Sequence, residues 1–310
     1  MDDLRTMSDA PRKAVPDQTV PEVTVPEKIT VEIDTPDGVR LVADHWAGSD
    51  PDALPVVLAH GGGQTRHSWG GTAAVLSSSG HRVLSMDLRG HGDSDWSPDG
   101  DYGMAGFSAD AIAVAEWIGS PVAWVGASLG GMTGLHAIDR APDHFAALVL
   151  VDITPRPAAG GVSRILEFMA KDAADGFATL DDAADAIAAY QPHRPRPTDL
   201  SGLSKNLRLG EDGRWRWHWD PAFLHVRTGD GSEHARDANH GDMETIARAL
   251  TLPTLLIRGK LSDLVTDAEA QEFLKMVPHA EYVDVAGAAH MIAGDKNDVF
   301  TDAVVAFLDR

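Results

Sequence analysis

One serine in this chain occurs in a context where its hydroxyl group could act as a nucleophile. Ser128 is at the centre of the sequence Gly-Ala-Ser-Leu-Gly, between an apolar, strand-like segment at residues 122–125 and a helix-like segment at residues 129–140. A chain that reverses from strand to helix so sharply leaves no room for a Cβ at Gly126 or Gly130, and it exposes the serine hydroxyl. The pattern therefore predicts a reactive serine at a strand-to-helix turn.

A serine hydroxyl needs a base to take its proton, and the base needs a third group to orient it. In a parallel α/β sheet, reactive groups lie on loops after the carboxyl ends of strands. His290 follows an expected strand at residues 281–285, and Asp263 follows one at residues 254–258. We expect His290 to take the proton from Ser128, and Asp263 to orient the imidazole.

Asp152 is the alternative acid. It follows an expected strand at residues 146–151, so its carboxylate could reach the same imidazole. The competing interpretation is that Asp152 caps or orients the loop that follows. We favour Asp263 and keep Asp152 as the second candidate.

Acyl transfer also requires donors for the negative oxygen that develops on the substrate. The residue after the serine, Leu129, can supply one backbone N–H from the start of its helix. A second can come from the loop at residues 60–63, His-Gly-Gly-Gly, because glycine lets the backbone approach a substrate closely. We expect Gly62 to be that donor, with Gly63 as the alternative.

Composition excludes several classes of function. The formal net charge is -21, from 47 acidic and 26 basic residues, so nucleic acid and anionic membrane surfaces would be repelled. There is no cysteine, which excludes disulfides and thiolate chemistry. No apolar run approaches the ~20 residues of a membrane span. Residues 1–27 are polar and proline-rich without the apolar core of a signal peptide, and we expect a disordered or extended tail and a cytoplasmic protein.

The order of elements predicts one α/β domain with an insertion. Strand and helix patterns alternate over residues 28–154 and again over residues 250–310, which is typical of a mainly parallel sheet with helices on both faces. Residues 155–249 break the alternation and read as a largely helical insertion. Metal-binding motifs, a phosphate-binding loop and a dinucleotide fingerprint are missing, so no metal and no cofactor are expected. Trp215, Trp217 and Trp219 could line an apolar pocket or attach the insertion to the main domain.

Together these residues resemble the α/β-hydrolase superfamily, in its lidded, cofactor-free branch. The resemblance rests on the loops at residues 60–63 and 89–94 (Arg-Gly-His-Gly-Asp-Ser), on the serine turn at residues 126–131, and on the pair formed by Asp263 and His290. It implies a doubly wound sheet of eight mostly parallel strands whose second strand is antiparallel, with the insertion as the cap. It also implies that Ser128 forms an acyl-enzyme, which water then hydrolyses.

The same resemblance makes several reactions of related enzymes less expected for this chain. Epoxide hydrolases and haloalkane dehalogenases are similar in outline but carry aspartate at the position of Ser128. Carbon–carbon hydrolases usually carry Trp after the histidine, where this chain has Met291. We therefore expect a hydrolase of small or medium, mostly apolar esters or lactones. The alternatives are perhydrolysis, acyl transfer or carbon–carbon cleavage on the same residues, and, from another class, a hydrolase-like binding protein with little turnover.

Overall fold

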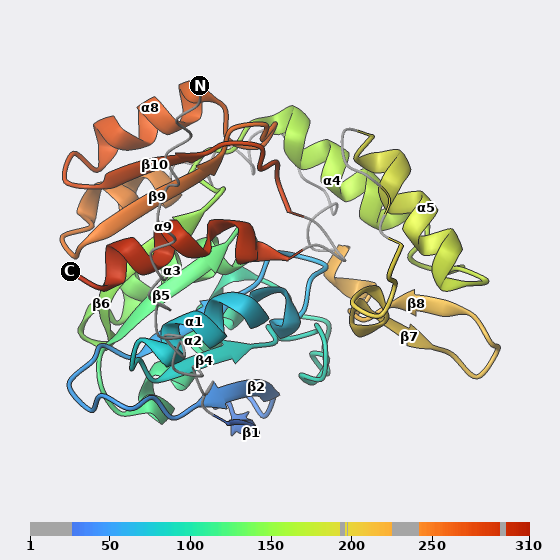
Figure 1. The fold of residues 1–310 in the computed structure, drawn as a ribbon, viewed down its shortest axis with the longest axis horizontal. Helices are drawn as coiled ribbons and strands as arrows, with labels where there is room; N and C mark the ends of the chain where they lie inside the picture. Colours follow the sequence, from blue (N-terminus) through green and yellow to red (C-terminus); the bar gives the residue numbers. More distant parts are fainter. Residues whose placement is uncertain (1–26, 193–195, 197, 225–241, 292–295) are drawn as a thin grey trace, which may run out of the picture.

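A computed structural model describes residues 27–192, 196, 198–224, 242–291 and 296–310; the expected tail at residues 1–27 thus lies outside the described residues, except for Glu27. An eight-stranded sheet forms the centre, in the order β1-β2-β4-β3-β5-β6-β9-β10 (Figure 1). The expectation of a mostly parallel sheet with an antiparallel second strand is confirmed, because β2 runs antiparallel to β1 and β4 and the other neighbours are parallel. The strands are β1 (Lys28–Asp34), β2 (Arg40–Trp46), β3 (Val56–Ala59), β4 (Val83–Met86), β5 (Val122–Ala127), β6 (Phe145–Val151), β9 (Thr254–Gly259) and β10 (Glu281–Val285).

Helices cover both faces of this sheet, because its central strands are apolar on both sides. In β3, Val57 packs into one hydrophobic cluster and the next residue, Leu58, packs into the other, as the two-residue period of a strand requires. The cluster containing Val57 is completed by α2 (Met104–Ile118), α3 (Leu129–Arg140) and α8 (Asp267–Met276). The cluster containing Leu58 is completed by α1 (Gly70–Ser78), η4 (Asn297–Phe300) and α9 (Thr301–Leu308).

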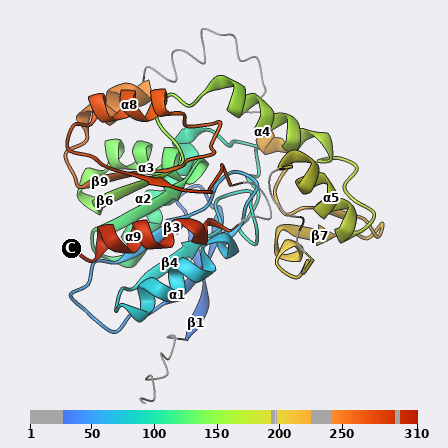
Figure 2. The same cartoon turned by 45° about the horizontal axis from the view of Figure 1, so that its top comes forward.

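Residues 159–217, which we call the cap segment, lie beyond one end of the sheet (Figures 1 and 2). They contain α4 (Ala159–Lys171), α5 (Leu180–Tyr190), η3 (Leu203–Asn206) and a hairpin of β7 (Leu207–Leu209) and β8 (Trp215–Trp217). Trp215 and Trp217 therefore lie in a strand of the cap segment. Residues 225–241 of the expected insertion lie outside the described residues.

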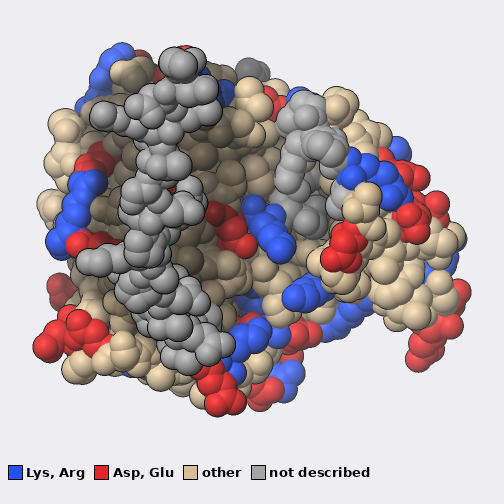
Figure 3. Space-filling model, in the orientation of Figure 1, with Lys and Arg blue, Asp and Glu red and all other residues tan. Residues whose placement is uncertain are grey.

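Charges of both signs lie side by side on the protein surface. On the face drawn in Figure 3, described Lys and Arg side chains lie next to Asp and Glu on both the main domain and the cap segment. Arg216 with Asp212 and Arg310 with Glu281 are two such pairs. No helix in the described part of the chain combines the length and apolar character needed to cross a bilayer.

Candidate active site

Ser128 occupies a constrained turn between β5 and α3. Its φ of 45° and ψ of -111° are unusual for a residue other than glycine, and its N–H donates to the carbonyl oxygen of Val151 at 3.1 Å. A Cβ on Gly126 would lie 2.3 Å from the backbone of Gly130, and one on Gly130 would lie 2.5 Å from the carbonyl oxygen of Ala59. The turn therefore requires glycine at both positions, as the sequence indicates.

His290 is held by a buried carboxylate. Oδ2 of Asp152 lies 2.7 Å from Nδ1 of His290, and the two residues are 2% and 7% exposed. Asp152 is fixed in turn, because Oδ1 accepts from the N–H of Gly259 at 3.0 Å and Oδ2 accepts from the hydroxyl of Ser262 at 2.7 Å. A carboxylate on Nδ1 keeps the proton on that nitrogen and leaves Nε2 as the acceptor.

The structure corrects the expectation that Asp263 orients His290. The Asp263 side chain is 37% exposed, and its Oδ2 forms an ion pair with Arg164 of α4 at 2.8 Å. The preceding residue, Ser262, is the one that points inward at this loop, where its hydroxyl also accepts from the N–H of Leu264. The alternative acid, Asp152, makes the contact that was expected of Asp263.

The candidate oxyanion donors lie in the same pocket as Ser128 and His290, which is also lined by Gly62 and Leu129. The carbonyl of Gly61 accepts from His60 Nδ1 at 2.8 Å and from the N–H of Gln64 at 3.1 Å. Because a trans peptide holds its C=O and N–H on opposite sides, these bonds direct the Gly62 N–H away from His60. Among the described residues, neither that N–H nor the Leu129 N–H has a hydrogen-bond partner, so both are available to a substrate.

This pocket, which we call the serine pocket, has a volume of about 110 Å³ and mainly apolar walls. One wall is a single stripe of α4, at positions i, i+3, i+4 and i+7. The side chains of that stripe are Val162, Ile165, Leu166 and Met169. Met132, Ile153, Phe223 and Leu264 are among the residues that line the rest of the pocket.

The three tryptophans do not line the serine pocket in the described structure, so the pocket-lining interpretation of Trp215, Trp217 and Trp219 is corrected. Trp217 is buried between aromatic rings, with centroids 5.3 Å from Phe177 and 6.0 Å from Phe168. Trp219 is buried and forms a β-bridge with His91. Trp217 therefore packs within the cap segment, and Trp219, just after that segment, attaches the chain to the main domain.

His60, in the loop at residues 60–63 that we call the oxyanion loop, and the neighbouring His91 have structural roles. His60 Nε2 accepts from the N–H of Leu88 at 3.1 Å, and His91 Nδ1 lies 3.0 Å from the carbonyl oxygen of Arg89. Both side chains are fully buried. Burial lowers the pKa of His60 to about 4 and the pKa of His91 to about 3. Both rings are therefore neutral at pH 7 and hard to protonate. Because they are also fully buried, neither competes with His290 as a base.

A search against models of protein families matches residues 55–296 to the family described as the alpha/beta hydrolase fold. The chain belongs to the α/β-hydrolase family.

No group of three or more histidine and acidic residues suited to a metal ion occurs in the ranges that the structure describes.

Several relatives of this α/β hydrolase are esterases by name. It is 29% identical over 289 residues to an esterase from Mycobacterium tuberculosis, covering 90% of this chain and 89% of the relative, and a crystal structure of that esterase superposes with a TM-score of 0.67 over 92% of each chain. A pimeloyl-[acyl-carrier protein] methyl ester esterase from Methylococcus capsulatus is 38% identical over 222 residues, or 68% of this chain and 77% of the relative. An α/β hydrolase from Novosphingobium aromaticivorans shares the fold, with a TM-score of 0.76, 24% identity, and coverage of 92% of this chain and 99% of that one.

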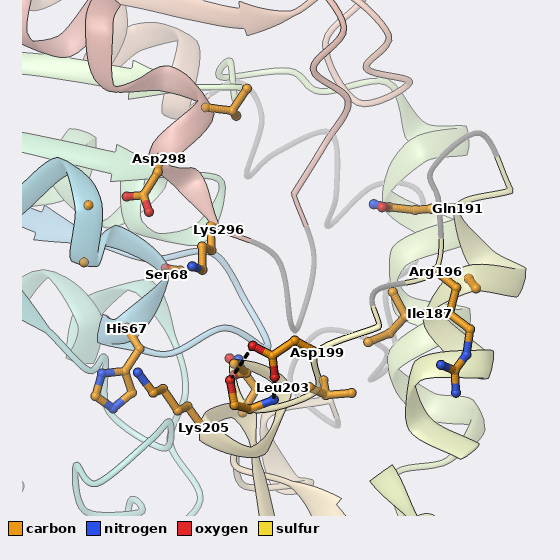
Figure 4. A pocket seen from close by; sticks show the side chains of 17 residues that line it. His67, Ser68, Ile187, Gln191, Arg196, Asp199, Leu203, Lys205, Lys296 and Asp298 are labelled. Carbon is orange, nitrogen blue, oxygen red and sulfur yellow. Dashed lines mark hydrogen bonds between the residues drawn. The ribbon is translucent and has the colours of Figure 1, made fainter. Parts of the chain in front are cut away.

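A second cavity in this hydrolase, of about 670 Å³, lies between the main domain and the cap segment (Figure 4). Ser68 in η1 (Arg66–Trp69) and Lys296 lie on its main-domain side, and Gln191, at the end of α5, lies on its cap side. Gln191 Nε2 donates to the backbone carbonyl of His290 at 3.2 Å. The cap segment thus directly contacts the loop that follows β10 and carries His290, which we call the histidine loop.

Proposed function

We propose that this chain is a serine hydrolase that cleaves carboxylic esters or lactones through an acyl-enzyme on Ser128. The observation that carries the proposal is the buried contact between Asp152 and Nδ1 of His290, because His290 lines the same pocket as Ser128. The esterase relatives in Mycobacterium tuberculosis and Methylococcus capsulatus support the same reaction class. Asp152, rather than Asp263, completes the proposed triad.

The proposed reaction has two steps. Nε2 of His290 takes the proton from the Ser128 hydroxyl as the oxygen attacks the ester carbonyl, and Asp152 stabilises the imidazolium that forms. The N–H groups of Gly62 and Leu129 hold the negative oxygen of the tetrahedral intermediate. The imidazolium then gives its proton to the departing alcohol, which leaves the acyl group on Ser128. A water that loses its proton to His290 attacks this ester and releases the acid.

The walls of the serine pocket indicate the substrate class. The α4 stripe offers an apolar surface without a charged side chain, which suits a hydrocarbon acyl or alcohol group. The volume of about 110 Å³ is well below the roughly 300–1,000 Å³ typical of sites for drug-sized ligands. We therefore propose short acyl esters and small lactones as substrates, in preference to long-chain lipids.

Hydrolysis of p-nitrophenyl acetate, butyrate, octanoate and a simple lactone tests the proposal. Wild type should hydrolyse the short esters with a burst of nitrophenol, and Ser128→Ala should lose roughly 10³-fold or more of kcat. Ser78→Ala, at an exposed serine of α1, is the matched control and should keep full activity. A wild type that neither turns over these substrates nor labels at Ser128 with a fluorophosphonate contradicts the proposal.

Perhydrolysis is a second candidate because of one relative. A non-heme chloroperoxidase from Burkholderia pyrrocinia is 27% identical over 290 residues, or 89% of this chain and 98% of the relative. In this reaction, hydrogen peroxide replaces water in the attack on the acyl group of Ser128, and a peracid is released. Measuring the amounts of peracid and acid formed from the same ester in hydrogen peroxide shows whether peroxide or water attacks the acyl-enzyme. If acid is the only product, this candidate is ruled out.

A further inference from the structure

We propose that Gln64 and Asn297 act as positioning residues for the oxyanion loop, through a buried pair of side-chain amides. The inference rests on the proposed function, because it concerns the Gly62 N–H as an oxyanion donor. Neither residue lines the serine pocket among the residues described, so neither is proposed to touch the substrate. Their effect is exerted through the backbone of Gly61.

The two amides pair reciprocally in the protein interior. Gln64 Nε2 donates to Oδ1 of Asn297 at 3.1 Å, and Asn297 Nδ2 donates to Oε1 of Gln64 at 3.1 Å. Both residues are fully buried, at 0% exposure. Buried amides of this kind are costly unless they are hydrogen-bonded, so each one fixes the orientation of the other.

The pair extends directly to the oxyanion loop. Oε1 of Gln64 accepts from the backbone N–H of Gly61 at 2.9 Å, while the backbone N–H of Gln64 donates to the Gly61 carbonyl at 3.1 Å. Gln64 therefore binds the peptide groups on both sides of the Gly61 Cα. The second of these peptides carries the Gly62 N–H, whose direction is set by the bonds on the Gly61 carbonyl.

Glycine at three successive positions makes such a restraint necessary. Residues 61–63 have no side chains to limit their backbone, and Gly63 adopts a φ of 80°, in the left-handed region. The oxyanion loop would otherwise sample several peptide orientations. A donor contributes to catalysis only when it already points at the developing charge, so the orientation of the Gly62 N–H must be fixed before the substrate binds.

Asn297 connects this restraint to a distant part of the chain. It is the first residue of η4, which packs against α1, and its Nδ2 donates to the hydroxyl of Ser68 at 3.3 Å. Ser68 reaches the wall of the second cavity, between the main domain and the cap segment (Figure 4). The amide pair thus ties the oxyanion loop to the segment that follows the histidine loop, 233 residues later in the sequence.

The test compares Asn297→Asp with Thr72→Val. Asn297→Asp keeps the acceptor for Gln64 Nε2 but removes the donor to Gln64 Oε1, so Oε1 faces a carboxylate. Thr72→Val is the matched control, because Thr72 is buried and its hydroxyl contacts Asp298 at 3.1 Å in the same η4 helix without touching the loop. Both variants are expected to lower the melting temperature.

Only the amide variant should slow catalysis per active site. We expect Asn297→Asp to lower kcat on p-nitrophenyl acetate by about 10- to 100-fold, below the roughly 10²–10³-fold for losing one oxyanion donor outright. KM should stay within about threefold, and a boronic acid that mimics the tetrahedral intermediate should bind more weakly by the same factor as kcat. Gln64→Met should give a similar loss, and the double variant should be no worse than Gln64→Met alone.

Titration of active sites with a fluorophosphonate gives kcat per active serine. It therefore allows the proposed function and the positioning role of Gln64 and Asn297 to be tested separately. A wild type without Ser128-dependent turnover contradicts the proposed function, and the positioning role with it. A wild type that turns over, beside titrated Asn297→Asp protein with unchanged kcat and unchanged boronic acid affinity, contradicts the positioning role alone. Equal losses of kcat in Asn297→Asp and Thr72→Val would also contradict it.

Discussion

Asp152 follows β6 at the same level at which Ser128 follows β5. Their preceding residues, Val151 and Ala127, are register partners in the parallel pair of strands. Ser128 and Asp152 have φ values of 45° and 52°, and they are the only residues other than glycine with positive φ among those described. Strained backbone of this kind persists where the surroundings fix it, and it concentrates at functional sites.

Replacing Ser262 with Ala tests how the carboxylate is held. The variant removes the hydroxyl that donates to Oδ2 of Asp152 at 2.7 Å but leaves the bonds to Gly259 and His290. A hydrogen bond to a buried charged group contributes about 1.5–3 kcal/mol, so we expect a loss of stability of that order. A less ordered carboxylate should lower kcat by roughly 3- to 10-fold. Urea unfolding and ester kinetics measure both effects, and a variant unchanged in both contradicts this role.

The geometry of the serine turn predicts a sharp difference between two glycines. Gly130→Ala would place a Cβ 2.5 Å from the rigid backbone carbonyl of Ala59, whereas nothing lies within 4 Å of a Cβ on Gly160 in α4. We expect Gly130→Ala to lose about 3 kcal/mol or more of stability. Gly160→Ala should be neutral or gain up to about 1 kcal/mol. Thermal unfolding checks both, and similar melting temperatures would contradict the crowded turn.

The α4 stripe should set the acyl-chain preference. Ile165 lines the serine pocket, while Ala170 lies on the exposed side of the same helix. Ile165→Phe reduces the free volume, so we expect the ratio of kcat/KM for hexanoate to that for acetate to fall about 10-fold or more, equivalent to roughly 1.4 kcal/mol of discrimination. Ala170→Phe should leave the ratio unchanged. If both variants keep the wild-type ratio, this helix does not contact the acyl group.

The buried histidines predict that stability falls in mild acid. Burial lowers the pKa of His91 from the ordinary 6.5 to about 3, and that of His60 to about 4. Between these values and pH 6.5 the unfolded chain binds a proton that the folded chain excludes. The free energy of unfolding therefore decreases as pH falls through this window, by about 1.4 kcal/mol per pH unit for each histidine.

His91→Gln isolates the contribution of one histidine to this dependence. The variant should be less stable than wild type at pH 7.5, and its stability should change less steeply between pH 6.5 and pH 4. Urea unfolding at four pH values gives the two slopes. Identical slopes for wild type and variant would show that His91 takes up its proton as readily in the folded state as in the unfolded one.

Much of the fold and most of the site followed from local patterns. Short apolar runs in the sequence predict the strands. The glycines on either side of Ser128 predict a turn that is too crowded for a Cβ at Gly126 or Gly130. Gly62 and His290 are expected in the site because each lies on a loop after a strand, and Leu129 because it directly follows the serine. The structure brings all three to the serine pocket.

The acid was assigned wrongly because strand-end position alone does not say which way a side chain points. Ser262 and Asp263 are neighbours on one loop, and only the hydroxyl of Ser262 turns inward. Asp152 was the second candidate because of its place directly after β6, which matches that of Ser128 after β5. The amide pair of Gln64 and Asn297 has no local signal, because its partners are 233 residues apart.

The most direct test of the proposed triad compares kcat of Asp152→Asn and Asp263→Asn on p-nitrophenyl acetate. Asparagine in place of Asp152 removes the negative charge beside His290 Nδ1, and we expect kcat to fall roughly 10⁴-fold. Asp263→Asn breaks only the partly exposed ion pair with Arg164, and kcat should stay within about threefold of wild type. A large loss in Asp263→Asn, with Asp152→Asn close to wild type, would contradict this account.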